Sequence, residues 1–357
     1  MRARCSARSN SPSRDSGSSL PARIVLVSDG SRRIFRRARR RRCLFRRLII
    51  ALAALSLLGG LAGGYLTWRA QQTLAGSAAD YLTPADRFLT VAGANVRVRI
   101  EGPEGAPPLI LLHGFIYSLE SFDAWAADLK RDHRVIRFDL LGHGLSGPDP
   151  QKRYSPQERA AFIGDLMDAL GLERAIVGGN SLGGLAAWRF AAAAPDRVSA
   201  LILVSPGAYP NQGVTDTPLS PPAPFALFLR NPTEAGVAFA LQGVYADKSS
   251  LSPEGVRRTA VMMRQPGNGD AYVESIEEFS LPDPAPLLKT IAAPTLILWG
   301  AEDKVIPVGQ GAAMAAAIPG AKLIVYPGVG HVAHEEASAQ SIADVRAFLA
   351  DVEGRTP

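Results

Sequence analysis

Five residues near the middle of the chain, 179–183, constrain the fold more than any other stretch. They read Gly-Asn-Ser-Leu-Gly, with Ser181 at the centre. A β-branched run at 174–178 predicts a strand before them, and an alanine- and leucine-rich run at 182–194 predicts a helix after them. Such a tight strand-to-helix turn strains its central residue, so glycine is needed two positions to either side. The Ser181 hydroxyl is therefore expected to stand above the sheet edge, beside the unpaired N–H groups of the helix.

The N-terminal part of the chain has a different composition from the rest. Residues 1–47 contain fifteen Arg and two Asp, a net charge of +13, and because the whole chain carries +6 the remainder carries −7. We interpret 1–47 as a basic, disordered tail. The basic character belongs to this tail, so the body is not expected to bind nucleic acid. Both cysteines also lie in the tail, and the body therefore needs no disulfide.

Residues 48–68 are 21 residues with no charge, and nearly all of them are apolar. A helix of this length spans about 30 Å, the thickness of the hydrocarbon core of a bilayer. Arginines precede the stretch, and Tyr65 and Trp68 lie near its other end. This arrangement predicts a single-pass membrane anchor with a cytoplasmic N-terminus. The body of the chain that follows is then expected on the extracytoplasmic, periplasmic side.

Three other interpretations of this segment are weaker. A buried globular helix leaves the arginine flank without a role. A cleaved signal peptide, with Ala75 or Ala79 near the cut, conflicts with an apolar run longer than the usual ~7–15 residues. Residues 31–35 resemble a twin-arginine export signal, but the apolar stretch begins well downstream of them. We therefore favour an uncleaved anchor.

The remaining residues divide into a linker, a core in two parts and an insertion. Residues 69–86 are a polar and alanine-rich linker. Residues 87–205 and 287–357 alternate apolar strand-like runs with helix-like runs, which predicts an α/β fold with a mostly parallel sheet. Residues 206–286 interrupt this rhythm, are rich in proline and contain helix-like pieces at 225–229, 237–244 and 253–263. An insertion of this size between strands predicts a cap or lid over a site.

A serine nucleophile needs a base and a group that orients the base. Asp303 follows a predicted strand and a glycine turn, and His331 follows the last predicted strand. Both would lie with Ser181 at the carboxyl ends of parallel strands, where open α/β sheets place their sites. Glu302 and His334 are the neighbouring rivals for the two roles. The order Ser, Asp, His along the chain favours Asp303 and His331.

The backbone N–H groups of Phe115 and Leu182 are predicted to form an oxyanion hole. Phe115 follows His113-Gly114 at the end of an apolar strand, and Leu182 follows the serine. Each such donor contributes on the order of 3 kcal/mol to lowering the barrier. No cluster has metal-ligand spacing, and no phosphate-binding glycine loop is present. No metal or cofactor is therefore expected.

Together these motifs resemble the α/β-hydrolase fold superfamily, from about Arg87 to the C-terminus. The resemblance implies an eight-stranded, mostly parallel sheet with helices on both faces. It also implies a helical cap after the sixth strand and a Ser181–Asp303–His331 triad. It does not cover residues 1 to about 80. The matching motifs are His113-Gly114-Phe115, the run 139–146 (Asp-Leu-Leu-Gly-His-Gly-Leu-Ser), residues 179–183, Gly300-Ala-Glu-Asp303 and Gly330-His331.

Within this superfamily the sequence favours a carboxylic ester hydrolase or lipase-like enzyme. The haloalkane dehalogenases and epoxide hydrolases of this superfamily carry an Asp nucleophile, and Ser181 argues against both. The Asn180-Ser181 pair and a cap also resemble the C–C hydrolases of aromatic ring-fission products. Those enzymes usually have Trp after the catalytic His, where this chain has Val332, and Gly-Pro-Gly in the oxyanion loop, where it has 115–118 (Phe-Ile-Tyr-Ser).

The predicted cap carries an apolar cluster, Phe225, Leu227 and Phe228, which would suit an apolar acyl or alcohol group of a small ester. An alternative from another class is a non-catalytic, membrane-tethered binding module of the same fold. The complete set of nucleophile, base and orienting residue argues against that alternative.

Overall fold

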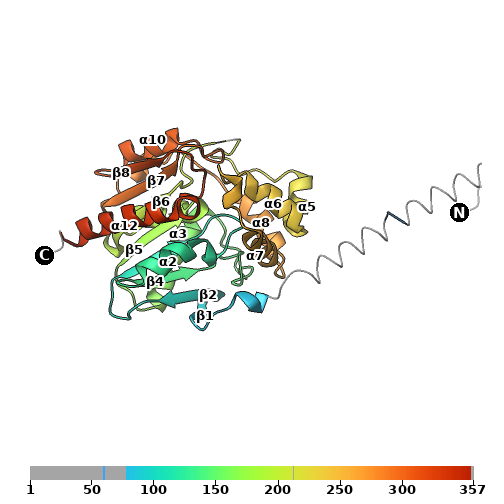
Figure 1. The fold of residues 1–357 in the computed structure, drawn as a ribbon, viewed down its shortest axis with the longest axis horizontal. Coiled ribbons are helices and arrows are strands. Elements are labelled where there is room, and N and C mark those ends of the chain that lie inside the picture. The colour runs from blue at the N-terminus through green and yellow to red at the C-terminus, as the bar shows by residue number, and fades with distance from the viewer. Residues whose placement is uncertain (1–58, 61–77, 212, 355–357) are drawn as a thin grey trace, which may run out of the picture. The chain divides into compact units, whose positions relative to one another are not determined.

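The computed structural model describes residues 59–60, 78–211 and 213–354 (Figure 1). The contacts between residues divide the chain into two compact parts, 1–68 and 69–357, and nearly all described residues belong to the second part. The predicted tail (1–47), the predicted anchor (48–68) apart from Gly59 and Gly60, and the linker up to residue 77 lie outside the described residues and stay predictions. Among the helices of the described stretches, none has the length and apolarity to cross a membrane.

An eight-stranded, mostly parallel sheet forms the centre of the second part, as predicted (Figure 1). Its spatial order is β1-β2-β4-β3-β5-β6-β7-β8. β2 is antiparallel to both of its neighbours, and all pairs from β4 to β8 are parallel. The strands are β1 (Asp86–Val91), β2 (Ala94–Glu101), β3 (Pro108–Leu112), β4 (Arg134–Phe138), β5 (Ala175–Asn180), β6 (Val198–Val204), β7 (Thr295–Gly300) and β8 (Lys322–Tyr326).

The central strands are apolar throughout because both of their faces are covered. Residues 109–112 of β3 have no exposed surface. Ile110 and Leu112 face one core, with α3 (Pro156–Ala169), α4 (Leu182–Ala193) and Met314 of α10 (Gly309–Ala317). Leu109 and Leu111 face the other, with α2 (Asp123–Leu129) and α12 (Ser338–Glu353). Helices therefore cover both faces, as a parallel sheet requires.

The start of α3 shows how local sequence sets an element boundary. Ser155 precedes the helix, and its hydroxyl accepts a hydrogen bond from the Glu158 backbone N–H at 3.3 Å. The Glu158 carboxylate in turn accepts from the Ser155 N–H at 3.2 Å. Such a capping box stabilises a helix start by about 1 kcal/mol.

Helices fill the connection between β6 and β7, and α5 to α8 (223–277) are called the insert below. Three of them match the helix-like pieces expected from the sequence, whereas α8 and α9 were not predicted. The insert has its own apolar core, which also includes Tyr117 and Val332 from loops at the sheet edge. The helices are α5 (Ala223–Arg230), α6 (Glu234–Gln242), α7 (Pro253–Met263), α8 (Asn268–Glu277) and α9 (Ala285–Leu288).

The first strand begins at the last residue of the predicted linker (69–86). A short 3₁₀ helix spans Ala78–Tyr81, and Asp86 belongs to β1. The Asp86 carboxylate accepts hydrogen bonds from Arg97 at 2.9 Å and from Arg99 at 2.8 Å. Burial alone would raise the pKa of Asp86, but hydrogen bonds from Arg99, Thr83 and Arg97 lower it to about 2. These long-range ion pairs, which the local sequence does not reveal, fix the first strand.

Candidate active site

Ser181 stands between the end of β5 and the start of α4, at φ 52° and ψ −113°. This left-handed conformation is strained for a residue with a side chain, at a cost on the order of 1–3 kcal/mol. The flanking glycines make the turn sterically feasible. A Cβ at Gly179 would lie 2.5 Å from the Gly183 carbonyl carbon, and a Cβ at Gly183 would lie 2.3 Å from the Leu112 oxygen. Any other residue at either position would push the serine out of place.

Asp303 and His331 meet at the carboxyl ends of β7 and β8. His331 Nδ1 lies 2.8 Å from Asp303 Oδ2, and both side chains are buried. The second carboxylate oxygen of Asp303 accepts from the N–H groups of Val305 and Ile306 at 2.8 and 2.9 Å. The carboxylate is therefore fixed on both sides, and it holds the imidazole with Nδ1 protonated and Nε2 available as a base.

The loop of His331 is joined to the serine turn through Asn180. The Asn180 side-chain amide donates to the His331 carbonyl and to the Val204 carbonyl, both at 3.1 Å. His331 Nε2 is buried and has no hydrogen-bond partner among the described residues, so no bond joins it to Ser181. Catalytic hydrogen bonds are often long without substrate and tighten on binding. The structure thus pairs Asp303 with His331 and connects their loop to the nucleophile turn.

The two rival residues have other surroundings. Glu302 is exposed, and its backbone N–H bonds to the Val329 carbonyl. His334 is buried and stacks on Phe122, with ring centroids 4.3 Å apart. Burial, with the proximity of His331, lowers the pKa of His334 to about 3. His334 is therefore a neutral core residue, and neither of its ring nitrogens has a hydrogen-bond partner among the described residues.

The predicted oxyanion donors lie on segments that touch each other. A Cβ at Gly114 would lie 2.8 Å from Asn180 Oδ1 and 3.4 Å from Ser181 Cβ, so the loop before Phe115 rests on the serine turn. In the described part of the chain, neither the Phe115 N–H nor the Leu182 N–H donates a hydrogen bond to another residue. Both amides are therefore free to bind a substrate oxygen.

His113 holds the oxyanion loop in place. Its Nδ1 lies 2.8 Å from the Gly114 carbonyl, and its Nε2 accepts from the Leu140 N–H at 3.0 Å. Burial lowers the pKa of His113 to about 4. The ring is therefore neutral, donates from Nδ1 and fixes the loop that carries Phe115.

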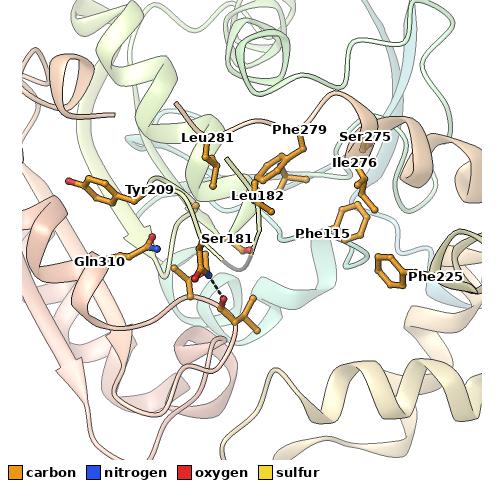
Figure 2. A pocket seen from close by; sticks show the side chains of 15 residues that line it. Phe115, Ser181, Leu182, Tyr209, Phe225, Ser275, Ile276, Phe279, Leu281 and Gln310 are labelled. Carbon is orange, nitrogen blue, oxygen red and sulfur yellow. Dashed lines mark hydrogen bonds between the residues drawn. The ribbon is translucent and has the colours of Figure 1, made fainter. Parts of the chain in front are cut away.

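An apolar cavity of about 420 Å³ opens beside Ser181 (Figure 2). None of the lining residues that the structure describes is charged, and the polar ones are Ser181, Asn211, Ser275 and Gln310 together with the Tyr209 hydroxyl. The lining residues are Phe115, Ser181, Leu182, Gly207, Tyr209, Asn211, Val214, Phe225, Ser275, Ile276, Phe279, Leu281, Val305, Ile306 and Gln310.

Of the three predicted substrate-binding residues, the structure places only Phe225 at this cavity. Leu227 is 63% exposed and does not line it. At about 100° of rotation per residue, position 227 lies on the opposite side of α5 from position 225. Phe228 stacks behind Phe225, with centroids 6.2 Å apart, and does not reach the cavity either.

Sequence reasoning missed most of the cavity wall. Phe279 and Leu281 follow α8, and Val305 and Ile306 follow Asp303, all in loops without a periodic pattern. For Val305 and Ile306, the one sequence signal that could have found them is their position directly after the proposed orienting residue, Asp303. Among the described residues, no three His, Cys, Asp or Glu side chains gather where they could hold a metal ion.

Comparison with known proteins agrees with this architecture. The chain is 28% identical over 250 residues to the 2-hydroxy-6-oxononadienedioate/2-hydroxy-6-oxononatrienedioate hydrolase of Comamonas testosteroni, covering 68% of this chain and 87% of the relative. It is 30% identical over 286 residues to an uncharacterized protein of Mycobacterium tuberculosis, covering 76% and 82%. The crystal structure of a carboxylesterase from Bacillus subtilis superposes with a TM-score of 0.65 at 21% identity, covering 80% and 97%. Residues 107–338 match the family model described as the alpha/beta hydrolase fold. The chain belongs to the α/β-hydrolase fold family.

Proposed function

We propose that the protein hydrolyses carboxylic esters whose acyl or alcohol group is neutral and apolar. The observation that carries this proposal is the uncharged cavity of about 420 Å³ that opens on Ser181. An apolar cavity gains about 0.8 kcal/mol for each methylene that it takes from water. A charged group would be desolvated there without a partner, which is costly.

The reaction would follow from the geometry of the site. His331 Nε2 takes the proton of Ser181 as the hydroxyl oxygen attacks the ester carbonyl. The N–H groups of Phe115 and Leu182 bind the oxyanion that forms, each worth on the order of 3 kcal/mol. The C–O bond then breaks, and His331 returns the proton to the leaving alcohol. A water molecule, deprotonated by His331, then attacks the acyl carbon; the bond to the Ser181 oxygen breaks, the acid is released, and His331 returns the proton to Ser181.

The insert would act as a cap on this site. Phe225 of α5 and Ser275 and Ile276 of α8 line the cavity (Figure 2), which supports this role. A cap that excludes water strengthens the electrostatic interactions of the site and shapes the space for the substrate.

A second candidate function is hydrolysis of a C–C bond in a ring-fission product. Two observations favour it. The Comamonas testosteroni relative is named for such a reaction. Arg159 is also buried next to the cavity: it does not line it, but its guanidinium donates a hydrogen bond to Oγ of the lining residue Ser275 at 2.8 Å. The Arg159 guanidinium also donates to the carbonyls of Tyr154 and Leu141. We favour the ester because the cavity wall itself is uncharged.

A substrate panel separates the two candidates. We expect kcat/KM for neutral p-nitrophenyl esters to rise by about fourfold for each added methylene until the cavity is filled, following the free energy of burial. The dianion 2-hydroxy-6-oxononadienedioate is expected to be cleaved at least ~10²-fold less efficiently than the best ester, since its two carboxylates meet an uncharged wall. More efficient cleavage of the dianion would favour the C–C hydrolase.

Phe225 is expected to set the preference for acyl length. Phe225→Ala should lower kcat/KM for the longest accepted ester by about tenfold, equivalent to ~1.4 kcal/mol of apolar contact, and leave the acetyl ester nearly unchanged. Leu227→Ala is the matched control, because Leu227 lies on the same helix but outside the cavity. The measurement is kcat/KM across acyl lengths for both variants. An equal loss at every length would mean that Phe225 only packs.

A further inference from the structure

The Glu336 carboxylate accepts hydrogen bonds from three backbone amides in two distant segments. It bonds to the Gly330 N–H at 2.8 Å, one residue before His331. It also bonds to the Ala246 N–H at 3.2 Å and to the Asp247 N–H at 2.7 Å, just after α6 of the insert. One carboxylate thus links the loop of the base to the insert.

Further contacts press the same two segments together. The His331 N–H donates to the Val244 carbonyl at 2.8 Å. A Cβ at Gly330 would lie 2.5 Å from that carbonyl oxygen, so only glycine allows the two backbones to approach this closely. The Tyr245 hydroxyl donates to the Glu335 carboxylate at 2.5 Å. Segment 244–247 of the insert therefore lies against the loop 330–336.

We propose that Glu336 is a positioning residue that holds the His331 loop against the insert, so that the base is aligned only while the insert is docked. The proposal rests on the proposed function, in which His331 is the base. An ionised carboxylate forms stronger hydrogen bonds to amides than a neutral acceptor does. The bond to Gly330 fixes the backbone on the N-terminal side of His331, and the bonds to Ala246 and Asp247 tie that loop to the insert, while Asp303 fixes the ring itself.

Loss of Glu336 leaves three amides without their acceptor and frees the loop to shift relative to Ser181. A displacement of about 1 Å in a catalytic constellation costs on the order of 10²-fold in rate. Because Glu336 does not line the cavity, substrate binding should be affected far less than the proton transfer. The expected signature is therefore a fall in kcat with little change in KM.

The test compares three variants of the full chain with the wild type. Glu336→Ala should lower kcat per titrated active site by about 10²-fold, with KM within about twofold. Glu336→Gln keeps the shape and one acceptor oxygen, and should lose about tenfold. Glu335→Gln is the matched control, because Glu335 contacts Tyr245 of the same insert segment but no backbone amide of the His331 loop. The kcat of this control should stay within about threefold of the wild type.

The rate of fluorophosphonate labelling of Ser181, measured well below the melting temperature of each variant, should follow the same order.

The outcomes separate this inference from the proposed function. Wild-type protein that neither reacts with the fluorophosphonate nor cleaves esters overturns both. An active wild type with an equally active Glu336→Ala overturns the positioning role alone. The role is also overturned if kcat per titrated site is unchanged and only the melting temperature falls, because Glu336 would then be purely structural.

Discussion

Replacement of Ser181 by alanine is expected to lower kcat for ester hydrolysis by at least ~10⁴-fold while the protein still folds. The hydroxyl is the proposed nucleophile, and without it the cavity and the oxyanion amides can only bind the ester. The side chain makes no structural hydrogen bond in the described part of the chain, and alanine tolerates φ 52° about as well as serine does. The measurement is kcat of the purified variant, with circular dichroism to verify the fold.

Ser205→Ala is the matched control for this experiment. Ser205 follows β6, the strand beside β5, is buried, and also has a positive φ, of 42°. It does not line the cavity, so its variant should keep turnover within about threefold. A fluorophosphonate probe should label the wild type and Ser205→Ala but not Ser181→Ala. Turnover near the wild-type rate in Ser181→Ala would show that the nucleophile is another residue, and an unlabelled wild type would support a binding module.

The parts of the fold that were predictable are those set by local sequence. Continuous apolar runs predict the buried strands, because a strand of a parallel sheet is covered on both faces. The start of α3 is set by the local pair Ser155 and Glu158, which form its capping box. Gly179 and Gly183 predict the turn that carries Ser181, since neither position has room for a Cβ. Each of these features depends on the backbone within a few residues.

The parts that were not predictable depend on how distant segments dock. The cavity wall combines loops after β6, α8 and β7, and no periodic pattern marks them. Glu336 contacts the insert about 90 residues away, through backbone amides that carry no sequence signal. In α5, by contrast, helical periodicity places Leu227 opposite Phe225, so the two side chains cannot line the same cavity.

The two C-terminal histidines are expected to respond in opposite ways to substitution. His331→Ala should lose about as much activity as Ser181→Ala, at least ~10⁴-fold, and the double variant should be little worse because the two residues act as one unit. His334→Ala should keep most of its kcat but lose stability, since it removes a buried ring that stacks on Phe122 at 4.3 Å. Such a large-to-small change in a core costs on the order of 2–4 kcal/mol. The measurements are kcat and the free energy of unfolding at neutral pH.

The pH dependence of stability gives an independent check on His334. Its folded pKa of about 3 lies below the unfolded value of ~6.5, so between these values the unfolded chain binds a proton that the folded protein excludes. The wild type should therefore lose stability through this group as pH falls from ~6.5 towards 3. His334→Ala lacks this contribution, and its deficit relative to the wild type should shrink as the pH is lowered. Denaturant unfolding of both proteins at pH 7.5 and pH 5 measures the difference.

The opposite pattern would reassign the base. If His334→Ala were inactive and His331→Ala active, the ring that stacks on Phe122 would have to leave its buried position to act as the base, and the hydrogen bond between Asp303 and His331 would serve only structure. His331 also carries the backbone contacts to Asn180 and Val244, so His331→Ala retains them and tests the ring alone. Loss of activity in that variant, with unfolding free energy close to that of the wild type, therefore assigns the proton transfer to the imidazole and not to the loop that holds it.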